Sequence, residues 1–155
     1  MKGNEKVIAT LNDLLADELT AINQYMVHSE MCANWGYERL HEITEKRAIQ
    51  EMKHAEMHIQ RIIFLEGTPV VSQLKKIIIG KDVAAQIQQD QIAETDAVKA
   101  YNAGIRLAVE AGDNGTREML ESILKDEEDH LDWLESQLEQ IQQLGIQNYL
   151  TEQVG

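Results

Sequence analysis

Four long stretches of this chain contain no proline and have apolar residues at alternating steps of three and four positions. They cover about residues 4–35, 37–66, 82–111 and 116–144. This spacing is typical of helices that are apolar along one face. A helix of about 30 residues is roughly 45 Å long, so it can bury that face only lengthwise against other helices. The sequence therefore predicts an all-α fold, an antiparallel four-helix bundle.

The lengths of the connections indicate how these helices follow one another. The connections at Gly36 and at residues 112–115 are short, which suits antiparallel neighbours. The middle connection, residues 67–81, is longer and contains six apolar residues, so we expect a long crossover along the side of the bundle. Residues 146–151 predict a short C-terminal fifth helix. Because 155 residues is the size of one domain, we expect residues 1–155 to form a single domain.

The charge of the chain limits the partners that we expect. The sequence has 27 acidic and 14 basic residues, and its formal net charge is −13. Such a chain repels nucleic acid and anionic membranes and attracts cations. The first residues lack the apolar run of a signal peptide, and no segment is long enough to span a membrane. The only cysteine, Cys32, cannot form an intrachain disulfide, so we expect a soluble, cytoplasmic protein.

Charged residues interrupt the apolar face of every predicted long helix. They are carboxylates on all four helices and histidines on two of them: Glu18, Glu51, His54, Glu94, Glu127 and His130. Each histidine follows a glutamate by three residues, which places the pair on one helix face. The spacing is also repeated, because Glu51 follows Glu18 by 33 residues and Glu127 follows Glu94 by 33.

Four buried carboxylates require positive charge, since an unpaired buried charge costs several kcal/mol or more. Oxygen and imidazole ligands suit iron or manganese, whereas zinc often prefers sites that are rich in thiolates. The pattern therefore predicts two metal ions between the helices, with these six residues as ligands. One Glu-x-x-His pair alone would be weak evidence. The alternative is that these residues belong to four solvated helix faces. In that case every one of these polar groups would interrupt an apolar face by chance.

With these residues the sequence resembles the bacterioferritin family over essentially its whole length. That family has the ferritin-like bundle, in which two helices each provide a glutamate and two each provide a Glu-x-x-His pair to two irons. The resemblance implies that Glu18 and Glu94 are terminal ligands. It implies that Glu51 and Glu127 bridge the irons and that His54 and His130 each bind one.

The resemblance also assigns roles to Tyr25 and Met52. Tyr25 resembles the family's buried tyrosine, which hydrogen-bonds a ligand or donates an electron, although an ordinary core tyrosine is an equally good interpretation from the sequence alone. Met52 directly follows Glu51 and is rotated about 100° away from the bundle interior. In bacterioferritins a methionine here implies a b-type haem shared between two subunits. Its pocket would be lined by Leu19, Ile22, Asn23, Met26 and Ile49.

The function that the resemblance implies is iron storage and detoxification. A di-iron ferroxidase centre would oxidise Fe(II) to Fe(III) with O2 or hydrogen peroxide. The ferric mineral would collect inside a hollow shell of 24 subunits, whose channels the short fifth helix would line. Release of the iron would require a ferredoxin-type reductant that passes electrons through the haem.

Two positions depart from the family pattern. Di-iron bundles often have an aspartate directly before each glutamate of the Glu-x-x-His pairs, where it holds the outer nitrogen of the opposing histidine. Asp126 fits this pattern, but the matching residue is Gln50. Some bacterioferritins bind a further iron through a histidine and an aspartate at positions 46 and 50. Lys46 and Gln50 predict that this accessory site is absent. Separately, Asp90 lies one turn before Glu94 and is a candidate for a residue that supports the metal ligands.

Other interpretations differ in testable ways. A haem-binding electron carrier would show haem without sustained iron uptake. A peroxidase that resembles rubrerythrin needs paired Cys-x-x-Cys motifs, which a single cysteine excludes. The DNA-protecting mini-ferritins build their metal site between subunits, and a purely structural bundle would have to tolerate its buried charges without metal. The sequence leaves open the physiological oxidant, the haem occupancy, a second subunit type, and whether the irons are permanent or in transit.

Overall fold

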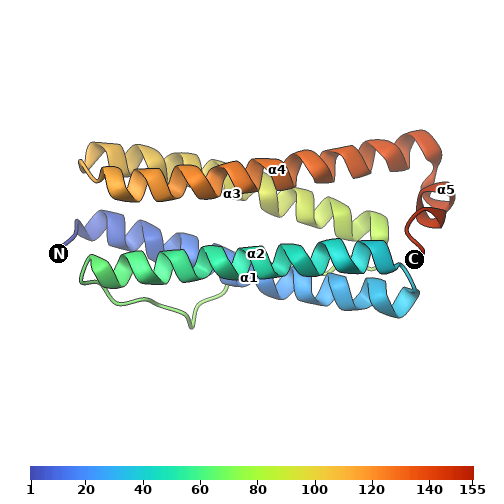
Figure 1. Ribbon diagram of the computed structural model, residues 1–155, viewed down its shortest axis with the longest axis horizontal. Coiled ribbons are helices and arrows are strands. Elements are labelled where there is room, and N and C mark those ends of the chain that lie inside the picture. Colours follow the sequence, from blue (N-terminus) through green and yellow to red (C-terminus); the bar gives the residue numbers. More distant parts are fainter.

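The computed structural model describes residues 1–155 and contains five helices and no strands. The helices are α1 (Glu5–Trp35), α2 (Glu38–Phe64), α3 (Val83–Glu110), α4 (Asn114–Leu144) and α5 (Ile146–Thr151). The first four lie side by side as a bundle, and α5 lies across the end where α4 finishes (Figure 1). The predicted all-α antiparallel bundle with a short fifth helix is confirmed. No helix is both long enough and apolar enough to cross a membrane.

Polar side chains determine where three of the helices begin. The side chain of Asn4 accepts hydrogen bonds from backbone N–H groups in the first turn of α1. Asp82 and Asp113 do the same for α3 and α4. These acceptors satisfy N–H groups that have no partner within the helix. Because Asp113 provides the cap, α4 begins two residues earlier than the expected residue 116.

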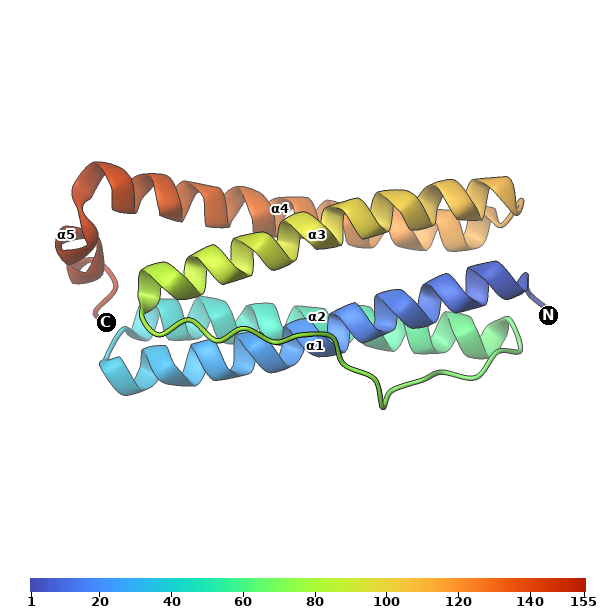
Figure 2. The same ribbon diagram turned by 180° about the vertical axis from the view of Figure 1, so that it is seen from behind.

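The crossover from α2 to α3 runs along α1 (Figure 2). Four side chains on α1, those of Asn12, Thr20, Gln24 and His28, accept hydrogen bonds from backbone N–H groups of the crossover. These contacts are needed because an extended segment beside a helix cannot pair its own backbone groups. The ladder of side chains thus fixes the long connection against one helix and closes that side of the bundle.

Two apolar clusters fill the bundle on either side of its middle. The larger cluster includes Leu11, Leu14, Ile62 and Ile123, and the smaller one includes Leu40 and Leu134 near the end covered by α5. Burial of each such side chain stabilises the fold by about 1.5–3 kcal/mol. Between the two clusters, the middle of the bundle is filled by buried polar side chains instead.

Candidate metal centre

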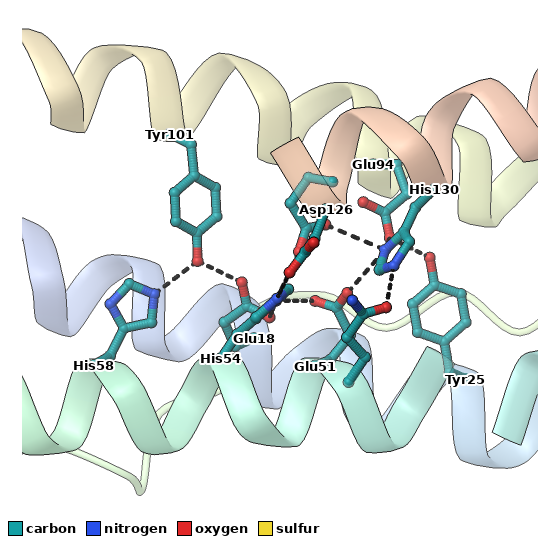
Figure 3. A network of polar contacts seen from close by, with 11 residues as sticks. Glu18, Tyr25, Glu51, His54, His58, Glu94, Tyr101, Asp126 and His130 are labelled. Carbon is teal, nitrogen blue, oxygen red and sulfur yellow. Dashed lines mark hydrogen bonds and ion pairs between the residues drawn. The ribbon is translucent and has the colours of Figure 1, made fainter. Parts of the chain in front are cut away.

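All six predicted ligand residues lie together in the middle of the bundle, and each is only 1–4% exposed. One glutamate comes from α1, one from α3, and a glutamate with a histidine from each of α2 and α4. The helices place these side chains so that they point toward one another (Figure 3). The helical spacing of three residues within each Glu-x-x-His pair explains why both members reach the same space.

The six residues form two overlapping clusters. Potential ligand atoms of Glu18, Glu51, His54 and Glu127 lie within 4.8 Å of one another. The same holds for Glu51, Glu94, Glu127 and His130, so Glu51 and Glu127 belong to both clusters. Each cluster therefore offers three carboxylates and one imidazole, and two adjacent metal ions could share two of the carboxylates.

The inner atoms of this site make no well-directed hydrogen bond. This holds for one oxygen of each of the four glutamates and for Nδ1 of both histidines. The two Nδ1 atoms do lie within ion-pair distance of a carboxylate, since His54 Nδ1 is 3.0 Å from Glu127 Oε1 and His130 Nδ1 is 3.1 Å from Glu51 Oε1. Such atoms are costly to bury unless something compensates them. They all surround one space, and oxygen with imidazole nitrogen is a donor set that iron and manganese accept. The residues present therefore fit two transition-metal ions.

The charges of the glutamates are strongly coupled. Burial, together with the charge of Glu18, raises the pKa of Glu51 well above its usual value. Burial and the contact with Glu94 do the same to the pKa of Glu127. Although burial opposes it, contacts with Glu51 and His54 lower the pKa of Glu18, and contacts with Glu127 and His130 lower that of Glu94. Burial and the neighbouring carboxylates thus favour the protonated forms of the two shared glutamates, and a bound cation would favour their ionised forms.

The outer nitrogen of each histidine contacts a side chain on the facing helix. His54 Nε2 lies 2.8 Å from Asp126 Oδ2, and His130 Nε2 lies 2.5 Å from Gln50 Oε1. Both rings thus turn Nδ1 toward the centre. Although burial lowers it, contacts with Glu127, Glu18 and Asp126 raise the pKa of His54 to about 10. Burial lowers the pKa of His130; Glu94 opposes this effect and Arg47 adds to it.

A buried tyrosine contacts a glutamate on each side of the centre. Tyr25 donates to Glu94 Oε1 at 2.5 Å, and Tyr101 donates to Glu18 Oε1 (Figure 3). Tyr101 was not among the site residues that the sequence predicts. A signal was present, because Tyr101 follows Tyr25 by 76 residues, the same interval that separates Glu18 from Glu94. Burial, followed by the neighbouring glutamate charges, raises the pKa of both phenols well above its usual value, so both act as donors.

Asp90 forms hydrogen bonds with side chains of α1 rather than with the candidate metal ligands. It accepts hydrogen bonds from Gln24 Nε2 and His28 Nδ1, each at 2.9 Å. His28 Nε2 in turn accepts from the backbone N–H of Gly80. Asp90 therefore joins α3 to α1 and to the crossover one turn from Glu94. Nothing in the spacing of Gln24 and His28 along the sequence indicates that they meet Asp90.

A cavity leads from the four glutamates to the surface between α1, α3 and the crossover. Its outer part is lined by the acids Asp17 and Asp96 and by Lys75 and Lys76 of the crossover. Lys75 Nζ lies 2.6 Å from Asp17 Oδ1 and 3.1 Å from Asp13 Oδ1. The centre is thus reachable from one side of the bundle, past side chains of both charges.

Met52 lies outside the bundle interior, as its position after Glu51 predicts. Its side chain is 44% exposed and lines a groove between α1 and α2. Ile22, Met26 and Ile49 line the same groove, together with Ser29, Glu30, Glu45 and Ala48. Leu19 and Asn23, which we expected there, are not among the lining residues. The surface around Met52 is therefore mainly apolar.

Comparisons with known proteins agree with this geometry. Residues 8–144 match the family model of the ferritin-like domain. The chain is 40% identical over 149 residues to a bacterioferritin of Mycolicibacterium paratuberculosis, covering 96% of this chain and 94% of that protein. It is 38% identical over 149 residues to a bacterioferritin of Brucella melitensis, covering 96% and 92%. It is 40% identical over 155 residues to a bacterial ferritin of Synechocystis sp., covering 99% of each. The chain therefore belongs to the bacterioferritin family.

Proposed function

We propose that this protein stores iron, with Fe(II) as its substrate and a ferric mineral as the stored product. The observation that carries the proposal is the pair of buried clusters that share Glu51 and Glu127. The names of the relatives, bacterioferritin and bacterial ferritin, support it at 38–40% identity over nearly the whole chain. The working unit is a hollow shell of 24 copies of this chain in the cytoplasm, each copy a single ferritin-like domain.

In this proposal each iron position has its own terminal ligands. Glu18 and His54 bind one iron, Glu94 and His130 bind the other, and Glu51 with Glu127 bridges the two. Support comes from the composition of the two clusters and from the inward Nδ1 atoms of both histidines. Four ionised carboxylates balance the charge of two divalent ions.

The proposed reaction is a ferroxidation with O2 or hydrogen peroxide as the oxidant. Iron supplies the redox chemistry, since each Fe(II) gives up one electron to become Fe(III). The protein holds the two metals close together and excludes bulk water from the site. A bound cation would favour the ionised forms of Glu51 and Glu127. Tyr25 orients Glu94 through its hydroxyl and is positioned to donate an electron to the centre.

Met52 would hold the iron of a b-type haem that two subunits would share. The residues fit this group, because a methionine thioether binds haem iron and the surrounding groove is mostly apolar. The haem would supply an electron path from a ferredoxin-type reductant during iron release. Ile22 and Met26 would contact its ring, while Glu30 and Glu45 lie at the polar edge of the groove.

The test is to load the purified protein with excess Fe(II) in air, separate it on a sizing column and count the iron retained per chain. Storage predicts far more than two irons per chain, eluting with a large shell. Two irons per chain would indicate a di-iron enzyme without a store. No retained iron would contradict the proposal.

A further inference from the structure

The two metal positions have equivalent ligand sets but differ in what lies behind their histidines. Each position has three carboxylates and one imidazole, and two of the carboxylates are shared. Asp126 Oδ2 lies 2.8 Å from His54 Nε2, whereas Gln50 Oε1 lies 2.5 Å from His130 Nε2. Gln50 and Asp126 are 76 residues apart, like the two histidines, so they occupy equivalent places in the two halves. One half therefore has an acid where the other has an amide.

An acid behind a metal-binding imidazole strengthens metal binding in two ways. It accepts the hydrogen bond of the outer N–H, which makes the inner nitrogen a better donor to metal. It also adds a full negative charge that attracts the cation. An amide oxygen accepts the same hydrogen bond but supplies only a dipole. Losing an outer partner of this kind typically costs about 10–100-fold in metal affinity.

We infer that the two positions bind metal unequally, with the position beside His54 the tighter one and the position beside His130 the weaker one. The inference rests on the proposed metal centre, since it concerns the relative affinity of its two halves. It also has a consequence for iron traffic. Iron beside His54 would stay longer, and iron beside His130 would exchange faster.

The test uses Co(II), which accepts the same oxygen and imidazole ligands. Metal-free, full-length protein is crystallised with one Co(II) per chain, and the occupancy of each position is measured from anomalous scattering. A titration alone is insufficient because the positions share Glu51 and Glu127. Repulsion between the two ions would separate the binding steps even if the positions were identical. We expect the occupancy beside His54 to exceed that beside His130 about tenfold.

Two isosteric substitutions exchange the outer partners. Gln50→Glu supplies an acid behind His130, and Asp126→Asn removes the acid behind His54. In the double variant the higher occupancy should move to the position beside His130. Glu128→Gln is the matched control, because it removes an exposed carboxylate of α4 that makes no ion pair with either histidine. This control should leave the occupancy ratio unchanged.

Two results would separate failure of the inference from failure of the centre. Equal occupancy in the unmodified protein, or a preference that remains beside His54 in the double variant, overturns the unequal affinities and leaves the two-metal centre intact. Absence of Co(II) from both positions in the unmodified protein overturns the proposed centre, and the inference with it.

Discussion

Tyr25 and Tyr101 are equivalent residues of the two halves, and each holds a terminal carboxylate from the opposite pair of helices. Tyr25 on α1 donates to Glu94 on α3, and Tyr101 on α3 donates to Glu18 on α1. Tyr101 has a further partner, because His58 Nε2 lies 2.7 Å from its hydroxyl oxygen. The two phenols therefore fix the outer ends of the centre, one on each side.

Replacement of Tyr101 by Phe should weaken metal binding at the position beside His54. The change removes the hydrogen bond that orients Glu18, and a hydrogen bond to a charged group contributes about 1.5–3 kcal/mol. We expect a loss of roughly tenfold in affinity at that position, measured by anaerobic Co(II) titration with occupancy determined in the crystal.

The matched control for this change is Tyr25→Phe, which should affect the position beside His130 instead. If both substitutions weakened the same position, or if neither changed the affinity, Tyr101 would be only a packing residue.

The sequence predicted the six candidate ligand residues because their chemistry conflicts with their place in an apolar helix face. It could not predict the contacts of Gln24 and His28 with Asp90, since polar residues on different helices meet only once the packing is known. Tyr101 was missed for another reason. A tyrosine in a core face is unremarkable by itself, and only its interval of 76 residues from Tyr25 marks it.

The start of α4 depends on Asp113. Its carboxylate accepts hydrogen bonds from the N–H and the hydroxyl of Thr116, and Arg61 Nη2 lies 2.8 Å from Oδ1. Although partial burial opposes it, Thr116 and Arg61 lower the pKa of Asp113 below its usual value. The ionised form of this residue is therefore stabilised by folding.

Asp113→Asn should destabilise the chain by about 1 kcal/mol near neutral pH, since asparagine can still cap the helix but provides no charge for Arg61. The contribution of the charge is present above the unfolded pKa, near 4, and disappears as the pH falls through the lower folded pKa. Urea unfolding curves of both proteins at low salt should therefore differ at pH 7 and converge in acid. A difference that persists below both pKa values would show that the charge is not responsible.

The crossover is positioned by side chains of α1, and Thr20 provides one contact that can be removed cleanly. Its hydroxyl accepts from the backbone N–H of Lys75 at 2.8 Å. Thr20→Val keeps the shape and removes the acceptor. We expect the Lys75 amide to exchange its hydrogen about fivefold faster, because a hydrogen bond contributes about 1 kcal/mol. Hydrogen–deuterium exchange with mass spectrometry measures this.

Thr95→Val is the control, because the Thr95 hydroxyl donates only to the carbonyl of Gln91 within α3. Unchanged exchange at Lys75 in Thr20→Val would mean that the crossover is held by its other contacts.

The four long helices were predictable because each combines an apolar face with a glycine or short turn at its end, and α1, α3 and α4 also begin at a capping side chain. The sequence also indicated a crossover along the bundle from its length and apolar content. It did not indicate that the crossover follows α1, because the ladder from Asn12 to His28 consists of ordinary polar residues that any helix surface can have.

At the scale of the whole molecule, the exposed groove around Met52 needs a partner surface in the proposed assembly. Met52→Leu should abolish haem binding, since leucine keeps the groove apolar but cannot ligate iron. Haem per chain is measured by absorbance after extraction into alkaline pyridine. Met26→Leu, which alters the same groove without removing the proposed ligand, should retain haem.

The proposed haem groove and the proposed iron centre share no lining residue, so iron loading by Met52→Leu should stay within about twofold of the unmodified protein. Full haem content in Met52→Leu would contradict ligation through this residue.

The number of Fe(II) ions that each chain binds without oxygen decides whether the two-metal centre exists. Equilibrium dialysis measures this number. The unmodified protein should bind two, and Glu51→Gln combined with Glu127→Gln should lose both positions because each depends on the shared carboxylates. Two ions in the unmodified protein and none held tightly in the variant would establish the centre. No bound iron in the unmodified protein, or an unchanged number in the variant, would contradict it.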